Sequence, residues 1–434
     1  MNGTVNEILG FMEENEVKFV RLSFCDLFGF HKNISVMSNE LRSAFENGVS
    51  FNAHAINGFC DITRSDLFLF PDPATLAVLP WRPGPGRVAR FFCDVKNPDG
   101  SAFPRDSRAL LKRVAERSEK MGYFCKIGAE CEFYLFVSDE NGEPTSATLD
   151  KGGYLDITPP LDKGGDIRRE ICLTIEEMGM NPEASHHEQG PGQNEIDFKF
   201  SDALSCADNF QDFKSAVKAI AARNGLFASF SPKPVPNAPG NGMHVNVSVF
   251  KNKENIFKNA GEGRSEAADS FIAGVLDRVS EMTLFLNPVA NSYERLGKFE
   301  APGHISWSRQ NRSQLIRIPA AEGEKARMEL RSPDPSMNPY LSFALIISAG
   351  LDGMENNAKL SPAADESCRP ETLRLLPDSL DKAIASAENS SFVKKVLGEE
   401  TLSKYLSVKK AEAADFAAAE SKEAFFKERY FGVI

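Results

Sequence analysis

The 434-residue sequence lacks a long apolar run, a secretion signal and an excess of positive charge. Its longest apolar stretch, residues 340–351, is too short to span a bilayer and predicts a buried helix. A formal charge of −11 disfavours nucleic acid or an anionic membrane as a partner. The first residues are acidic and interrupted by polar groups, unlike a signal peptide. We therefore expect a cytoplasmic protein with no nucleic-acid or membrane partner.

Paired-cysteine motifs are also absent. The eight cysteines lie at positions 25, 60, 93, 125, 131, 172, 206 and 368, and none forms a CxxC pair. Several lie within segments of apolar periodicity. This placement favours free, buried thiols in a reducing compartment over a disulfide framework or a zinc finger.

The length predicts two domains. Residues 17–37 are typical of two β segments joined through Asp26 to Gly29, and a second β-rich part covers residues 67–95. A helix capped by Asp106 and ended by Gly122 follows. We place the boundary near residue 102, between a small, mostly β domain (1–102) and a larger domain (103–434).

Three more helices are expected in the larger domain. They cover residues 166–179, with Asp166 as N-cap and Gly179 as the stop, 209–225 and 266–287. The last fifty residues predict a charged helical tail whose charges form a solvated face.

Four short segments alternate polar and apolar side chains: 128–136, 193–200, 242–250 and 327–332. Each alone is typical of a half-solvated strand. Together they predict one curved sheet whose apolar face packs on helices. The other face would carry Glu130, Glu132, Glu188, Glu195, Glu329 and His244.

Five carboxylates converging without counter-charge would repel one another strongly. Oxygen-rich sites with one imidazole suit hard divalent cations, so these groups predict two Mg²⁺ or Mn²⁺ ions. Gly190 and Gly192 would let the chain turn tightly between Glu188 and Glu195.

A second group of residues is basic. Arg295, Arg309, Arg312 and Arg317 lie in two nearby segments, and guanidinium groups hold phosphate and carboxylate oxygens in bidentate fashion. Arginines beside divalent cations suit phosphoryl transfer from ATP. Surface ion pairing remains the alternative for Arg309. Neither GxxxxGK[ST] nor GxGxxG occurs, so a P-loop or kinase-type ATP site is not supported.

Several segments resemble the glutamine synthetase family in family order: GAECEF, HHEQGPGQNE, KPVPNAPGNGMHVNVS, NPVANSYERL, FEAP, NRSQLIRIP and ELRSPDPSMNPYL. The resemblance covers nearly the whole chain. It implies an α+β fold with a small N-terminal β-grasp domain and a catalytic domain built on a curved antiparallel sheet. It also implies ATP, two Mg²⁺ or Mn²⁺ ions per site, glutamate and ammonia as substrates, and a dodecamer of two hexameric rings that shares active sites between neighbouring subunits.

The resemblance also implies residue roles. Glu132, Glu188 and Glu195 match the ligands of one metal, and Glu130, His244 and Glu329 those of the second. The phosphate-contacting positions are Arg312, Arg317 and Arg327, with Glu183, Asn246 and Ser248 on the nucleotide side. The substrate positions are Arg295 and Arg331 for the glutamate carboxylates, Gly240 for its amino group, Tyr154 and Asp66 for the ammonium pocket, and Glu300 for the flap that closes over the intermediate.

The sequence departs from the family pattern in the N-terminal loop. Asn52 in FNAHAI stands where the family has an aspartate that binds ammonium and removes its proton. An amide does neither, although the nearby His54 could act as the base. Pro239 replaces an asparagine before GMH, and the spacing from Arg295 to Glu300 is one residue shorter than usual. Three readings follow: a glutamate–ammonia ligase, a γ-glutamyl ligase for an organic amine, and a catalytically silent scaffold.

Overall fold

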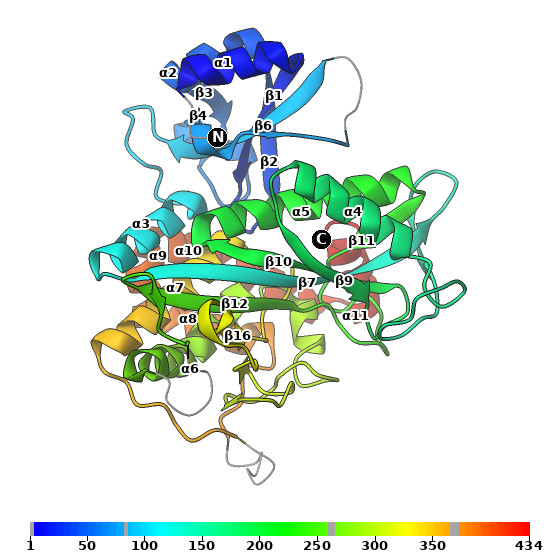
Figure 1. Cartoon of the computed structure of the whole chain (residues 1–434), viewed down its shortest axis with the longest axis vertical. Helices are drawn as coiled ribbons and strands as arrows, with labels where there is room; N and C mark the ends of the chain where they lie inside the picture. The colour runs from blue at the N-terminus through cyan, green and yellow to red at the C-terminus, as the bar shows by residue number, and fades with distance from the viewer. Residues whose placement is uncertain (1–3, 82–85, 259–264, 365–372) are drawn as a thin grey trace.

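The computed structural model describes residues 4–81, 86–258, 265–364 and 373–434. Figure 1 shows a small N-terminal unit, in blue, above a larger unit built around a long sheet. Each unit has its own hydrophobic core. The expected α+β architecture is confirmed in both units.

The N-terminal unit is a mixed sheet of six strands in the order β2-β1-β6-β4-β3, with β5 on β6. Strands β1 and β6 pair in parallel, and the other pairs are antiparallel. The predicted hairpin is present, because β1 and β2 pair from Phe19–Met37 to Cys25–His31. Its elements are α1 (Val5–Glu14), β1 (Val17–Cys25), β2 (His31–Met37), α2 (Leu41–Asn47), β3 (Val49–Asn52), β4 (Asp66–Pro71), β5 (Ala77–Val78) and β6 (Arg87–Lys96).

The larger unit contains ten strands in one sheet, in the order β14-β15-β16-β12-β7-β10-β9 with β8, β11 and β13 at the sides. Only the short β14–β15 pair is parallel among its described ladders. The strands are β7 (Phe124–Ser138), β8 (Pro144–Thr148), β9 (Pro182–His187), β10 (Gln193–Asp202), β11 (Leu226–Ser229), β12 (Met243–Lys251), β13 (Glu254–Asn255), β14 (Trp307–Ser308), β15 (Ile316–Arg317) and β16 (Met328–Leu330).

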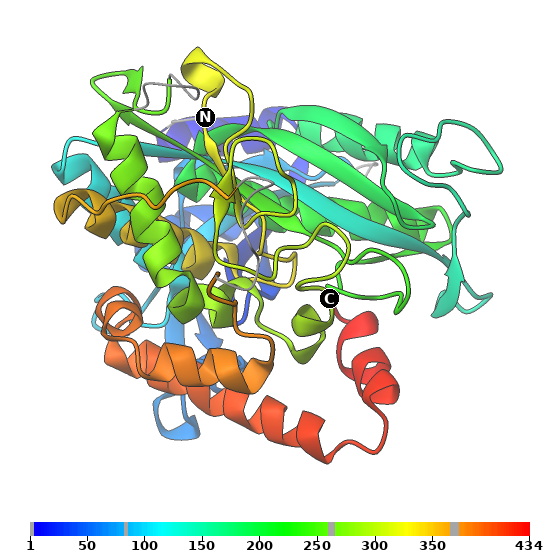
Figure 2. The same cartoon turned by 90° about the horizontal axis from the view of Figure 1, so that it is seen from below.

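Helices pack on this sheet and form a C-terminal bundle. Figure 2 shows the C-terminal helices, coloured orange to red, gathered on one side of the molecule. None of the helices in the described ranges is both long and apolar enough to cross a membrane. The helices are α3 (Ser107–Lys120), α4 (Gly165–Glu177), α5 (Ala203–Arg223), α6 (Glu266–Leu286), α7 (Pro339–Glu355), α8 (Leu380–Glu388), α9 (Ser391–Leu397), α10 (Glu399–Ala418) and α11 (Lys422–Phe426).

The strand register explains how distant acidic residues meet. All four alternating segments belong to this one sheet, as predicted. Their apolar members, such as Cys131 and Phe133, are fully buried in the core. Because side chains alternate across a strand, the polar members project to the opposite face. The facing pairs are Glu130–His244, Glu132–Glu195, Glu130–Asp197 and Asn246–Glu329.

Two helix boundaries differ from the prediction. Helix α4 begins at Gly165 after the N-cap Gly164, so Asp166 lies in the first turn, where its charge still suits the helix dipole. Helix α5 begins six residues earlier than predicted, because the Asp202 side chain accepts a hydrogen bond from the Ser205 amide and caps the helix. The cap at Asp106 and the helix at 266–287 are confirmed within about one residue.

The charged C-terminal tail is not wholly solvated. Lys409 and Glu412 on α10 are 4% and 6% exposed, and their charged atoms lie 2.8 Å apart. The Tyr430 hydroxyl donates to Glu412 at 2.6 Å. Pairing within the bundle allows these two charges to be buried, and this interaction is not visible in the charge pattern alone.

The cysteine prediction is confirmed for the seven cysteines in the described ranges. All seven are free thiols, five of them buried and Cys60 and Cys172 half-buried. Cys368 lies outside the described residues.

A buried arginine joins the two units. Arg108 on α3 is 2% exposed. Its guanidinium lies 2.8 Å from Asp208 on α5 and 3.0 Å from both Asp72 and Asp94 in the N-terminal unit. The guanidinium therefore satisfies carboxylates from both sides of the seam.

We expect Arg108→Leu to lower the free energy of unfolding by about 3–5 kcal/mol, because it leaves the buried Asp208 carboxylate without its counter-charge. Urea unfolding followed by circular dichroism measures this loss. The control is Lys382→Leu, which removes a surface pair with Asp378 whose partners are 66% and 63% exposed and should cost less than about 1 kcal/mol. Equal losses in the two variants would contradict a clamping role for Arg108.

Candidate active site

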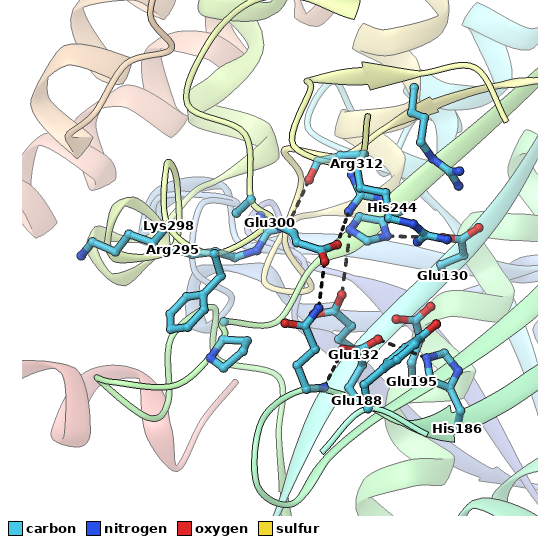
Figure 3. A pocket seen from close by; sticks show the side chains of 18 of the residues that line it. Glu130, Glu132, His186, Glu188, Glu195, His244, Arg295, Lys298, Glu300 and Arg312 are labelled. Carbon is cyan, nitrogen blue, oxygen red and sulfur yellow. Dashed lines mark hydrogen bonds and ion pairs between the residues drawn. The ribbon is translucent and has the colours of Figure 1, made fainter. Parts of the chain in front are cut away.

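A cavity of about 230 Å³ opens on the polar face of the large sheet (Figure 3). Strands β7, β10 and β12 form its floor, and the loops after β9, before β12 and after α6 form its rim. Twelve residues predicted from the sequence line it: Glu130, Glu132, Tyr154, Glu188, Glu195, Gly240, His244, Arg295, Glu300, Arg312, Arg317 and Arg331.

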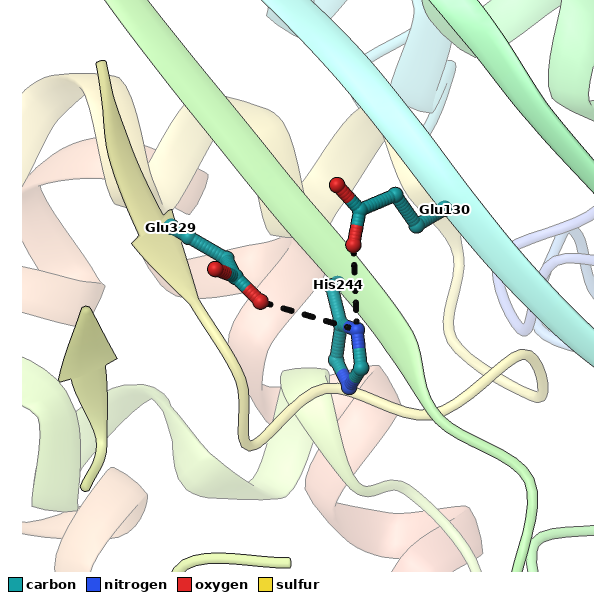
Figure 4. Close-up of side chains that lie close together, drawn as sticks. All are labelled: Glu130, His244 and Glu329. Carbon is teal, nitrogen blue, oxygen red and sulfur yellow. Dashed lines mark hydrogen bonds and ion pairs between the residues drawn. The ribbon is translucent and has the colours of Figure 1, made fainter. Parts of the chain in front are cut away.

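One group of possible metal ligands comprises Glu130, His244 and Glu329 (Figure 4). The Nδ1 atom of His244 lies 3.3 Å from a Glu130 oxygen and 3.7 Å from a Glu329 oxygen. Burial raises the pKa of Glu130, but its contacts with His244, Asn246 and Arg327 together outweigh this and lower the pKa to about 2. These are the three residues that the sequence assigned to one ion.

A second group comprises His186, Glu188 and Glu195. The Nε2 atom of His186 lies 3.1 Å from a Glu188 oxygen. The prediction combined Glu132 with Glu188 and Glu195. Glu132 lines the same cavity and accepts from the Gly242 amide at 2.8 Å, and the third member of the close group is His186. The role of Glu132 as a ligand stays a prediction. The sequence feature that could have identified His186 is its position two residues before Glu188.

The electrostatics of the floor favour a bound cation. The pKa of Glu195 is raised well above its usual value, mainly by burial and secondly by repulsion from Glu132. Burial and repulsion from Glu130 raise the pKa of Asp197 to about 7. The buried Oδ1 atom of Asp197 has no hydrogen-bond partner. An oxygen-rich set with these uncompensated charges fits Mg²⁺ or Mn²⁺.

Arginines form the opposite wall. The Arg317 Nε–H donates to Glu329 at 2.6 Å, and the Arg331 guanidinium also donates to this carboxylate. Arg295 is 3% exposed and donates to the backbone carbonyls of Ser332 and Arg331 at 2.7 and 3.1 Å. These contacts fix the guanidinium planes that the sequence assigned to phosphate and carboxylate recognition.

Hydrogen bonds with His187 and Asp150 fix the loop that carries Glu188. A ring nitrogen of His187 lies 2.6 Å from the Glu188 carbonyl oxygen, and the other lies 2.9 Å from Asp150. Asp150 also accepts from the Gly192 amide at 2.8 Å. Gly192 has a φ of +72°, as the predicted tight turn requires, and a Cβ at Gly190 would overlap the Tyr134 hydroxyl.

Three residues predicted to contact the nucleotide or its phosphates lie outside the cavity lining: Asn246, Ser248 and Arg327. Asn246 donates to Glu130 at 2.9 Å and accepts from Arg327 at 2.8 Å. Asn246 therefore links Arg327 to a residue that lines the cavity. Ser248 is 2% exposed and donates to the Ala326 carbonyl at 3.0 Å. Its hydroxyl therefore does not face the cavity.

Three further residues lie away from the cavity of their own chain. Glu183 forms an ion pair with Lys325 at 3.6 Å. Asn52 and Asp66 are paired positions on β3 and β4. Figure 1 labels both strands in the N-terminal unit. The Asn52 side chain accepts from the His54 amide at 3.1 Å.

Sequence comparison places this site in a known class of enzymes. Residues 104–427 match the family model of the glutamine synthetase catalytic domain, and residues 16–98 match that of the glutamine synthetase β-grasp domain. The chain belongs to the glutamine synthetase family. The expected β-grasp fold of the N-terminal unit is thereby confirmed.

Individual relatives cover almost the whole chain. A glutamine synthetase of Clostridium saccharobutylicum is 44% identical, over 95% of this chain and 96% of its own. One of Methanosarcina mazei is 45% identical, over 96% and 95%. A solved structure described as a GmaS/ADP complex is 31% identical with a TM-score of 0.87, and covers 97% of this chain and 98% of its own.

Proposed function

We propose that this protein joins ammonia to the γ-carboxylate of glutamate at the expense of ATP. The observation that carries the proposal is the pair of acidic clusters, Glu130–His244–Glu329 and His186–Glu188–Glu195, beside a wall of ordered arginines. The relatives named glutamine synthetase at 43–45% identity support the same reaction. The ADP complex of the related fold supports ATP as the nucleotide.

The arginines and the acidic clusters at the cavity would have separate roles. Arg295 and Arg331 would orient the glutamate carboxylates, and Arg312 and Arg317 would contact the phosphates. The two acidic clusters would hold two Mg²⁺ or Mn²⁺ ions, which neutralise charge on the transferring phosphoryl group when bound. Glu132 would complete the ligand set between them.

The reaction would proceed in two steps. A γ-carboxylate oxygen attacks the γ-phosphorus, the bond to ADP breaks, and a γ-glutamyl phosphate forms. The ammonia nitrogen then attacks the acyl carbon, and the bond to phosphate breaks. The extra proton on nitrogen passes to Glu300, whose carboxylate lies at the cavity rim.

The second candidate acceptor is an organic amine. Asn52 in the N-terminal loop leaves room for a substituent where the family carboxylate would bind ammonium, but Asn52 alone does not choose between the acceptors. Apolar surface from Phe299 and Pro239 at the cavity favours the organic amine. Tyr154 would border the acceptor in either case.

The proposed function also includes an oligomer in which neighbouring copies share active sites. Asn52 and Asp66 lie in the N-terminal unit and would reach the cavity of a neighbouring copy, as in a dodecamer of two hexameric rings. The proposed location is the cytoplasm. Analytical ultracentrifugation would measure the assembly, and a stable monomer with full activity would contradict the shared site.

The function is tested with purified protein, Mg²⁺, ATP and glutamate, to which ammonium, hydroxylamine or simple alkylamines are added. Product and phosphate should form with ammonium. Turnover with alkylamines but not with ammonium would select the organic-amine ligase. Nucleotide binding without turnover for any acceptor would indicate a silent scaffold.

Asn52→Asp should raise kcat/KM for ammonium by roughly 10²-fold, because a carboxylate attracts the cation and accepts its proton. The replacement keeps the oxygen that accepts from the His54 amide, so folding should not change. Initial rates across an ammonium series measure the effect. Asn47→Asp, at an exposed position of the same unit, is the control, and an unchanged kcat/KM in Asn52→Asp would contradict this role for the loop.

A further inference from the structure

The rim of the cavity includes a short flap, defined here as residues 297–301. Lys298, Phe299, Glu300 and Ala301 all line the cavity. Phe299 has a φ of +54°, a conformation that is uncommon and costly for an aromatic residue. The backbone alone does not favour this path, so contacts with other segments must hold the flap in place.

Gln189 supplies one of these contacts. Its Nε2 amide donates to Glu300 Oε1 at 3.0 Å. Its backbone N–H donates to Glu188 Oε2 at 2.7 Å. Gln189 therefore joins the flap to the loop that carries Glu188, a proposed metal ligand. Figure 3 labels Glu300 and Glu188 on the two segments that are joined.

The residue next to Glu300 in the flap is held by a cation–π contact. The ammonium of Lys233 lies 4.6 Å from the centre of the Phe299 ring, and the same ammonium donates to the Ala238 carbonyl. The second oxygen of Glu300 lies 3.8 Å from the Arg331 guanidinium. Each of these contacts joins the flap to a segment distant in sequence.

An ordinary surface hydrogen bond is the simpler interpretation, because Gln189 is exposed and the Glu300 side chain is 49% exposed. Two features argue against it. The acceptor is a carboxylate, which strengthens the bond. The bond also connects opposite sides of the cavity opening, so that breaking it would release the flap at its centre.

We propose that Gln189 is a positioning residue, whose amide holds Glu300 across the mouth of the cavity and so shields the acyl phosphate from water. This inference rests on the proposed function. If the flap opens, a water oxygen attacks the acyl carbon, the bond to phosphate breaks, and glutamate and phosphate are lost without product. Gln189 would thus set how tightly ATP consumption is coupled to product formation.

The test compares Gln189→Glu with Gln189→Lys in the full-length protein. Glutamate preserves the size but removes the donor and places a like charge beside Glu300, whereas lysine retains a donor that reaches the carboxylate. We measure phosphate released per γ-glutamyl product and phosphate released without acceptor. Gln189→Glu should raise acceptor-free release by about ten-fold, and Gln189→Lys should remain within roughly two-fold of wild type.

A simple folding defect would give a different pattern. Gln189→Glu should keep the wild-type melting temperature and the KM for ATP, so that only coupling changes. Phe299→Ala, which removes the cation–π contact, should show the same loss of coupling. Asn141→Asp, in the exposed turn between β7 and β8, adds a charge elsewhere and should leave the ratio unchanged.

The outcomes separate the two proposals. Wild-type protein that forms no product with any acceptor contradicts the proposed function, and this inference with it. A wild-type ligase whose Gln189→Glu and Phe299→Ala variants keep the wild-type phosphate-to-product ratio contradicts only the role of Gln189.

Discussion

Glu195→Gln should abolish ATP-dependent product formation and, at the same time, stabilise the metal-free protein. Glu195 is 7% exposed and faces Glu132 across β10 and β7. Neutralising it removes repulsion in the absence of a cation, worth roughly 0.5–2 kcal/mol of stability. The same change removes a ligand atom, so we expect kcat to fall by roughly 10³-fold.

The pH dependence of this effect follows from linkage. Because the pKa of Glu195 is raised, the folded metal-free protein binds more protons than the unfolded chain. Its stability should therefore fall as the pH rises from the unfolded value of about 4.3 through the raised pKa of the folded state. Glu195→Gln should flatten this dependence.

Thermal melts in EDTA and in Mg²⁺, from pH 4 upward, measure both effects. Wild type should gain melting temperature on addition of Mg²⁺, and Glu195→Gln should gain less. Glu254→Gln, at a surface position paired with Lys258, is the control. A metal-free Glu195→Gln protein that melts below wild type would contradict the repulsion argument.

Glu329→Gln should also abolish activity, but with the opposite effect on stability. Glu329 is fully buried and accepts from both Arg317 and Arg331. An amide directs hydrogens at one of these guanidinium groups and removes the carboxylate that Arg317 and the buried Arg331 share, which should cost about 3–5 kcal/mol. Urea unfolding in EDTA measures the loss.

The two variants also separate the proposed ions. Isothermal titration with Mn²⁺ should find two sites per wild-type chain and one in each of Glu195→Gln and Glu329→Gln. Loss of both sites in one variant, with the fold intact, would contradict two separate ligand groups.

The alternating segments made most of the cavity floor predictable. A period of two places Glu130, Glu132 and Glu195 opposite the apolar residues of the same strands, and an apolar face must be buried. The same rule could have identified His186, which precedes Glu188 by two residues but was not among the predicted ligands. The order of strands in the sheet was not predictable from this pattern.

Other features depend on the path of the chain in space. Ser248 shares the face of Asn246 but lies one repeat further along β12, opposite Lys126, where the Ala326 carbonyl accepts its hydrogen bond. The contact between Gln189 and Glu300 joins residues 111 positions apart and depends on the conformation of the flap. Local periodicity contains no information about either.

The most direct test of the account is a crystal grown with Mn²⁺ and ADP, with anomalous scattering recorded to locate manganese. We predict two peaks per chain, one within coordination distance of Glu130, His244 and Glu329, and one beside Glu188 and Glu195. Peaks elsewhere, or a nucleotide-bound site without manganese at these groups, would contradict it.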